Sequence, residues 1–217
     1  YQTIEDLIKS TNLEKAQQTI ESNLRNSPKD ANLYYYMGIV HLVKMNADDA
    51  IEQFEKAIEL KDDDYRFYEN LGDAYGLKAQ TSNMFSAMFV IGDMRESWEK
   101  AIELRPDLVS SRVRLATYYF MAPSVAGGDD EKALKLADEV IELEPAKGYA
   151  LKGRYYQQKE EFGKAEQQFL SSLKIDSTNG NVLNLLGYLY LKQKKYDDAL
   201  KSFNHYVTLY PNEANPY

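Results

Sequence analysis

Cysteine is absent from this chain of 217 residues, and histidine occurs only as His41 and His205. Without cysteine there can be no disulfide, no thiolate nucleophile and none of the thiolate-rich structural zinc sites. The two histidines are too distant in the sequence to form a His-x-x-x-His or His-Glu-x-x-His metal motif. We therefore expect no catalytic residue, no metal site and no cofactor, and we do not expect an enzyme.

Glycine, with 11 residues, and proline, with 6, are both scarce. No glycine stands in a Gly-x-x-x-x-Gly-Lys-Ser/Thr or Gly-x-Gly-x-x-Gly motif, so the sequence offers no phosphate-binding loop. Apolar runs stay far below the roughly 18 to 20 residues that cross a bilayer, so no membrane span is expected. Excess positive charge is also lacking, because the net charge is −8, and this argues against a nucleic-acid partner.

The first residue is Tyr1 rather than methionine, so we interpret the sequence as a processed or trimmed chain. Together with the lack of cysteine, this slightly favours an exported, periplasmic bacterial protein over a cytoplasmic one. What the sequence does contain is typical of a folded protein: 44% apolar residues, 28% charged residues and 18 tyrosines.

A short pattern recurs along the whole chain. One part is a Leu-Gly or Met-Gly pair with an aromatic residue or histidine three positions after the glycine, as at Gly38, Gly72 and Gly187. The other part is an alanine with a bulky residue four positions later, as at Ala50 and Ala165. Because these spacings place the residues on one face of a helix, the pattern predicts a series of helix pairs. The glycine and alanine are small and should let the two helices of a pair approach closely.

The pattern resembles the tetratricopeptide repeat (TPR), which has a period of about 34 residues and the consensus W-x2-L-G-x2-Y…A-x3-F…P. The resemblance implies an all-α fold, a right-handed α-solenoid of stacked antiparallel helix pairs. It covers essentially the whole chain, as a single domain from residue 1 to 217. The expected repeats are a partial one at 1–30, full ones at 31–64, 65–108, 109–145, 146–179 and 180–213, and a stub at 214–217.

Two repeats are longer than the others. The 65–108 repeat has about ten extra residues between Ala79 and Asp93, and because this stretch lacks proline we expect two long helices there. The 109–145 repeat has about five extra residues, which form a loop with turn chemistry around Pro123 and Gly127-Gly128.

Acidic residues stand at the expected helix starts. We expect them to cap free backbone N–H groups and to favour the positive end of the helix dipole. The acidic runs are Asp48-Asp49, Asp62-Asp63-Asp64, Asp129-Asp130 and Asp197-Asp198.

The first helix of each pair lines the concave groove in this architecture, and the resemblance implies that partners bind there. Tyrosines supply rigid aromatic area, asparagines can bond a peptide backbone and arginines can grip a carboxylate. The groove residues that we expect to contact a partner are Tyr35, Tyr36, Asn70, Asp73, Arg114, Arg154, Asn184 and Tyr188. Other groove positions carry Val113, Lys147 and Asn181.

Some relatives grip the acidic C-terminus of a chaperone with a clamp for two carboxylates. Of the five positions that form this clamp, Asn70 and Arg114 match, whereas Tyr35, Ile39 and Ser110 do not. We therefore do not expect that specific function.

An apolar cluster in the long repeat has two interpretations. It either packs against the insert of the next repeat or forms an exposed patch for a partner or a second copy of the chain. A membrane contact is disfavoured because lysine and arginine clusters do not flank it. The cluster consists of Met84, Phe85, Met88, Phe89 and Ile91, and the facing insert residues would be Phe120, Met121 and Val125.

The sequence as a whole predicts a non-enzymatic protein-interaction scaffold that binds a peptide or protein segment in its concave groove. One alternative is an oligomerisation module that uses the extended repeat, with Phe85, Met88 and Phe89 in the contact between copies. A second alternative is a protein that binds a small ligand or lipid beneath the long helices.

Overall fold

The computed structural model describes residues 1–211, with the side chain of Met84 excepted. This described part is all helical and contains no strand. Its α-helices are α1 (Gln2–Lys9), α2 (Leu13–Asn26), α3 (Ala31–Val43), α4 (Ala47–Leu60), α5 (Tyr65–Thr81), α6 (Met84–Leu104), α7 (Val109–Met121), α8 (Asp130–Leu143), α9 (Pro145–Gln158), α10 (Phe162–Ile175), α11 (Gly180–Lys192) and α12 (Tyr196–Leu209). A 3-10 turn, η1 (Ser124–Ala126), precedes α8. The predicted stub at 214–217 lies outside the described residues, as do the last two residues of the 180–213 repeat.

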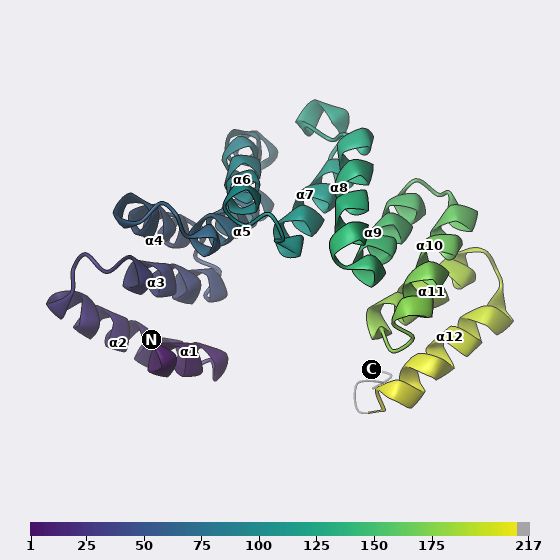
Figure 1. Ribbon diagram of the computed structural model, residues 1–217, viewed down its shortest axis with the longest axis horizontal. Helices are drawn as coiled ribbons and strands as arrows, with labels where there is room; N and C mark the ends of the chain where they lie inside the picture. The colour runs from purple at the N-terminus through teal and green to yellow at the C-terminus, as the bar shows by residue number, and fades with distance from the viewer. Residues whose placement is uncertain (212–217) are drawn as a thin grey trace. The chain divides into compact units, whose positions relative to one another are not determined.

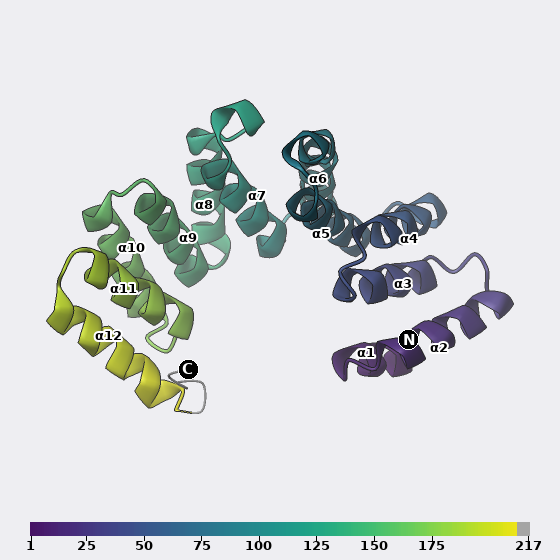
Figure 2. The same ribbon diagram turned by 180° about the vertical axis from the view of Figure 1, so that it is seen from behind.

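The chain divides into two compact units, residues 1–111 and 112–217, each with its own buried apolar clusters. Consecutive helices pack against each other within a unit, as α3 and α4 do in the first and α11 and α12 do in the second (Figure 1). The same pairs are seen from behind in Figure 2. The predicted all-α fold of stacked helix pairs is thereby confirmed, whereas a single domain over the whole chain stays a prediction.

Three-residue turns of one kind close four of the helix pairs. The middle residues Thr11, Met45, Glu160 and Lys194 all have positive φ, from 57° to 62°. A side chain in this left-handed region costs on the order of 1 kcal/mol, which the packing of the paired helices offsets. Each turn reverses the chain, so the second helix returns antiparallel along the first.

Small residues in the first helices let the second helices approach closely. A Cβ atom added to Gly38 would lie 2.5 Å from the ring of Phe54 in α4. One added to Gly187 would lie 2.5 Å from the ring of Phe203 in α12. The predicted role of the recurring glycine is therefore confirmed, because the aromatic ring of the second helix occupies the space that a side chain would need.

The long repeat has its extra residues in helices. The helices α5 and α6 contain 17 and 21 residues, whereas α3 and α4 contain 13 and 14. The insert of the following repeat is instead a compact turn, with η1 after Pro123 and a left-handed Gly127 at φ 87°. Both departures from the repeat length therefore lie between the two helices of a pair, where the sequence places them.

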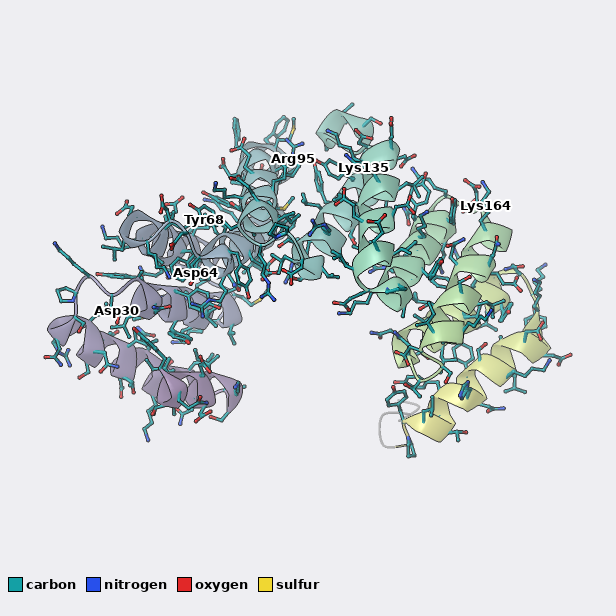
Figure 3. The ribbon with its side chains drawn as sticks, in the orientation of Figure 1. Asp30, Asp64, Tyr68, Arg95, Lys135 and Lys164 are labelled. Carbon is teal, nitrogen blue, oxygen red and sulfur yellow. The ribbon has the colours of Figure 1, made fainter. Side chains whose placement is uncertain are left out.

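Capping by aspartate is only partly as expected. Asp64 and Asp129 accept backbone hydrogen bonds at the starts of α5 and α8. Asp30 does the same at the start of α3, and Figure 3 labels it together with Asp64. The expectation is wrong for Asp48-Asp49 and Asp197-Asp198, which lie inside the first turns of α4 and α12 and make no cap hydrogen bond. Their carboxylates can favour the helix dipole without accepting from the terminal N–H groups.

None of the helices in residues 1–211 combines the length and the apolar character that crossing a bilayer requires.

Candidate partner-binding pockets

The second unit carries a pocket of about 590 Å³ on its first helices. Pockets of this size are typical of sites that bind small molecules or short peptide segments. The lining comes from α7, α9 and α11 and from the residue before α11. It consists of Val113, Lys147, Ala150, Leu151, Arg154, Asn179, Asn181, Val182, Asn184, Leu185 and Tyr188.

Local sequence positions these walls. Pro145 stands at the first position of α9, where its fixed φ suits a helix start and its missing N–H costs no hydrogen bond. Gly153 in α9 lies against the ring of Phe169 in α10, so α9 and α10 pack closely. Asn179 caps α11, and its Oδ1 atom accepts from the Val182 N–H group at 3.2 Å. The pocket therefore has a rigid helical frame.

Positive charge and amides dominate the polar part of the lining. The cations are Lys147 and Arg154, and no aspartate or glutamate belongs to the lining. The Lys147 ammonium forms an ion pair with Glu144 at 2.6 Å. Arg154 is exposed and has no hydrogen-bond or ion-pair partner among residues 1–211.

Tyr188 presents the largest exposed aromatic surface of this lining, with 60% of the residue exposed. Its ring meets that of Phe203 edge-on, with centroids 5.3 Å apart and an interplanar angle of 73°. Because the ring is supported from one side, it can receive a ligand on the other at a low cost in side-chain entropy. The structure thus brings together three of the predicted groove residues: Arg154, Asn184 and Tyr188.

The first unit has a smaller pocket of about 210 Å³. Its central cation is Arg66, whose guanidinium bonds Asp64 at 2.9 and 2.6 Å and lies 5.2 Å from the centre of the Tyr35 ring. These hydrogen bonds from Arg66 hold the pKa of Asp64 below its usual value. The full lining is Glu5, Ile8, Lys9, Tyr35, Tyr36, Ile39 and Arg66.

Tyr35 and Tyr36 both line this pocket, as expected of groove residues, but they also pack within the chain, so their contact with a partner stays a prediction. Tyr36 is only 7% exposed, and its hydroxyl donates to the carboxylate of Glu5 in α1. Burial, followed by this hydrogen bond, raises the pKa of Tyr36. Tyr35 packs its ring 5.2 Å from those of Tyr36 and Phe67.

Three other predicted groove residues lie outside both pocket linings. The amide of Asn70 donates to the Arg66 carbonyl at 2.8 Å, one turn earlier in α5. Asp73 accepts from the indole N–H of Trp98 at 3.0 Å and so joins α5 to α6. Arg114 is half-buried on α7.

Comparison with known protein families identifies one kind of repeat in three segments of the chain. Tetratricopeptide repeat models match residues 1–65, 146–179 and 180–213. The chain belongs to the tetratricopeptide repeat family. The matched segments include both helix pairs, α9–α10 and α11–α12, that frame most of the larger pocket.

Several known proteins resemble this TPR protein. Protein bimA of Emericella nidulans is 33% identical over 88 residues, which are 40% of this chain and 11% of that protein. The crystal structure of MamA superposes with a TM-score of 0.65 and 17% identity, over 82% of this chain and 96% of that chain. The structure of YrrB, a TPR protein with an unusual peptide-binding site, superposes with a TM-score of 0.55 and 16% identity, over 89% and 93%. At these identities the two structural likenesses concern the fold alone.

The TPR pattern gives no signal for some residues of the pockets. Asn179 precedes α11, so it is a helix cap and falls outside the first-helix positions that define the groove. Glu5 and Lys9 belong to the partial repeat at the start of the chain, where the pattern is weakest. Arg66 does occupy a groove position, but its engagement with Asp64 shows only in the structure.

Three residues of the apolar cluster in the long TPR repeat are exposed on α6. Phe85 and Phe89 are 79% and 83% exposed, and Met88 is 56% exposed. Their spacing of three and four residues places them on one side of the helix. We call Phe85, Met88 and Phe89 the α6 patch.

No group of three or more histidine, aspartate or glutamate side chains that could hold a metal ion is found within the described part of the chain.

Proposed function

We propose that this TPR protein is a non-enzymatic interaction scaffold that binds an extended peptide or protein segment in the pocket of α7, α9 and α11. TPR proteins bind protein partners, and TPR scaffolds are generally non-enzymatic. The observation that carries the proposal is the composition of the 590 Å³ pocket. It combines an apolar floor with side-chain amides and one exposed aromatic ring, which is the composition that fits a peptide backbone and its side chains.

The side-chain amides support binding of a peptide backbone. Asn181 and Asn184 line the pocket, and neither side chain has a hydrogen-bond partner among residues 1–211. An amide offers both donors and an acceptor, as a peptide group does, so two of them can pair with an extended chain. The peptide-binding site described for YrrB supports the same class of ligand for this fold.

A selection with phage-displayed random heptapeptides tests this proposal. Peptides selected on the wild-type protein are expected to bind Tyr188→Ala at least about tenfold more weakly, because a buried interface tyrosine commonly contributes at least about 2 kcal/mol. Tyr196→Ala is the matched control, since Tyr196 is 64% exposed on α12 and lies outside the pocket lining. Fluorescence anisotropy of the synthetic peptides gives the affinities. Failure to select any peptide, or equal losses in both variants, would contradict the proposal.

The exposure of the α6 patch favours a second candidate function, self-association through the long repeat. Monomeric proteins seldom expose a contiguous group of large apolar side chains without a partner for it. Two phenylalanines about 80% exposed on neighbouring turns of α6 form such a group. The small-ligand alternative stays a prediction, because the two pockets described above do not lie beneath the α5–α6 extension.

Light scattering over a concentration series tests self-association. The wild-type mass is expected to rise above the monomer value of 25.0 kDa with concentration, whereas Phe85→Asp/Phe89→Asp stays at that value. Each copy would bring two buried carboxylates to such a contact, where their desolvation and mutual repulsion cost several kcal/mol. Val43→Asp/Met45→Asp is the control, since it places two charges on exposed apolar residues that do not belong to the α6 patch. A wild-type protein that is monomeric throughout would rule this candidate out.

A further inference from the structure

We propose that the pocket of α7, α9 and α11 selects a peptide segment that carries one carboxylate, and that the guanidinium of Arg154 binds this carboxylate. This inference rests on the proposed peptide-binding function and adds the chemistry of the ligand. Its basis is the contrast between the charges of the pocket and those of the chain. The chain has 34 acidic and 26 basic residues, yet the lining has two cations and no acidic residue.

Arg154 differs from three other arginines in its lack of an acceptor. Arg66 bonds Asp64, Arg105 bonds Asp107 and Arg112 bonds Glu139, with nitrogen–oxygen distances of 2.6 to 3.0 Å. The Arg154 guanidinium has five N–H donors and no acceptor among the described residues. A planar fork of donors in a pocket without anions fits a carboxylate bound through two parallel hydrogen bonds.

The second cation of the lining is already paired, so the pocket fits one carboxylate rather than two. The Lys147 ammonium lies 2.6 Å from the Glu144 carboxylate, which is not part of the lining. A ligand carboxylate at Lys147 would have to compete with Glu144, whereas one at Arg154 meets no competitor. This arrangement is unlike the two-carboxylate clamp, whose matching residues Asn70 and Arg114 lie outside the pocket.

The surroundings of Arg154 strengthen a bond to a carboxylate. Leu151 and Leu185 contribute apolar surface to the same lining, and a peptide segment bound over it would reduce the access of water to an ion pair at Arg154. A charge-assisted hydrogen bond gains strength in such an environment of lower dielectric constant. Asn181 and Asn184 can hold the flanking peptide groups, so that the acidic side chain or chain end is presented to the guanidinium.

Matched peptides separate this inference from the proposed function. Each fluorescein-labelled heptapeptide that binds the wild-type protein is resynthesised in three forms: unchanged, with each glutamate or aspartate replaced by glutamine or asparagine, and with a C-terminal amide. The form that removes the recognised carboxylate is expected to bind about 10 to 100 times more weakly, as for loss of a hydrogen bond between charged groups. The first replacement identifies a side-chain carboxylate, and the amide identifies the chain end.

Variants of the protein assign the effect to Arg154. Arg154→Ala should bind the unchanged peptide more weakly than the wild type by a similar factor. It should also bind the unchanged and the neutral peptide with equal affinity. Arg154→Lys should bind with intermediate affinity because it keeps the charge but loses the fork. Lys135→Ala, which removes an exposed cation of α8 (Figure 3), should behave as the wild type. Far-UV circular dichroism checks that each variant is folded, which is expected because Arg154 is exposed.

The measured affinities test the carboxylate, the role of Arg154 and the proposed function separately. Peptides that depend on Tyr188 but bind equally well in charged and neutral forms would overturn the carboxylate inference and leave the proposed function standing. A carboxylate effect of the same size in Arg154→Ala and the wild type would overturn the assignment to Arg154. Selection of no peptide at all would overturn the proposed function and, with it, this inference.

Discussion

Phe169→Ala is expected to lower the free energy of unfolding by about 3 to 5 kcal/mol, the range found when a buried phenylalanine is truncated. Phe169 is fully buried in α10 and belongs to an apolar cluster with Val182, Leu186 and Leu189 of α11. The substitution therefore leaves a cavity where two successive helix pairs meet. In a solenoid, stability comes from each repeat and its contacts with its neighbours, so this position affects both.

Urea unfolding followed by far-UV circular dichroism measures the loss. A second substitution tests whether the cause is the cavity. In the wild type, a Cβ atom on Gly153 would overlap the Phe169 ring, so Gly153→Ala alone should be destabilising by about 1 to 3 kcal/mol. In the Phe169→Ala background the added methyl group has room, so its cost should vanish. Additive losses in the double variant would contradict close packing of this glycine against this ring.

Gly148→Ala is expected to destabilise the second unit by about 2 to 3 kcal/mol, the upper part of the usual range for overpacking. A Cβ atom at this position would lie 2.7 Å from the Cα atom of Ile141 in α8. Two of the three nearest atoms, the N and Cα atoms of Ile141, belong to the backbone of a helix, so they cannot move aside as the end of a side chain can. The helices α8 and α9 would have to separate, and α9 carries Lys147, Leu151 and Arg154 of the pocket.

Gly163→Ala is the matched control for this prediction. Gly163 lies in the first turn of α10, in the same unit, and a Cβ atom there would meet nothing within 4 Å. Alanine is the better helix former, so the midpoint of thermal unfolding should stay unchanged or rise slightly. A Gly148→Ala protein as stable as Gly163→Ala would show that α8 and α9 are less closely packed than the structure has them.

Much of the pocket in the second unit could be predicted from positions within the repeat. The resemblance to the TPR pattern implies that Arg154, Asn184 and Tyr188 face the groove, because they occupy groove positions of its first helices. The structure brings all three into one lining. Helical geometry is regular, so a residue's place in the repeat decides its side of the helix.

The first unit shows what a position within the repeat does not specify. Tyr36 occupies a groove position, yet its hydroxyl donates to Glu5, which belongs to a partial repeat with little recognisable pattern. Asn70 is directed into its own helix by a hydrogen bond to the Arg66 carbonyl. Such partners depend on side-chain conformations and on helices about 30 residues away in the sequence, and the repeat pattern carries neither.

By itself the sequence determined the helix pairs, the close approach at the recurring glycines, the position of the extra residues and the family, because each depends on spacing within a helix. Only the tertiary structure decided which groove side chains have no hydrogen-bond or ion-pair partner within the described part of the chain and can therefore bind a ligand. Arg66 and Lys147 are both cations on first helices, as is Arg154, and they differ only in whether a carboxylate lies within reach. That distinction comes from distances of a few ångströms between side chains, which spacing in a sequence does not specify.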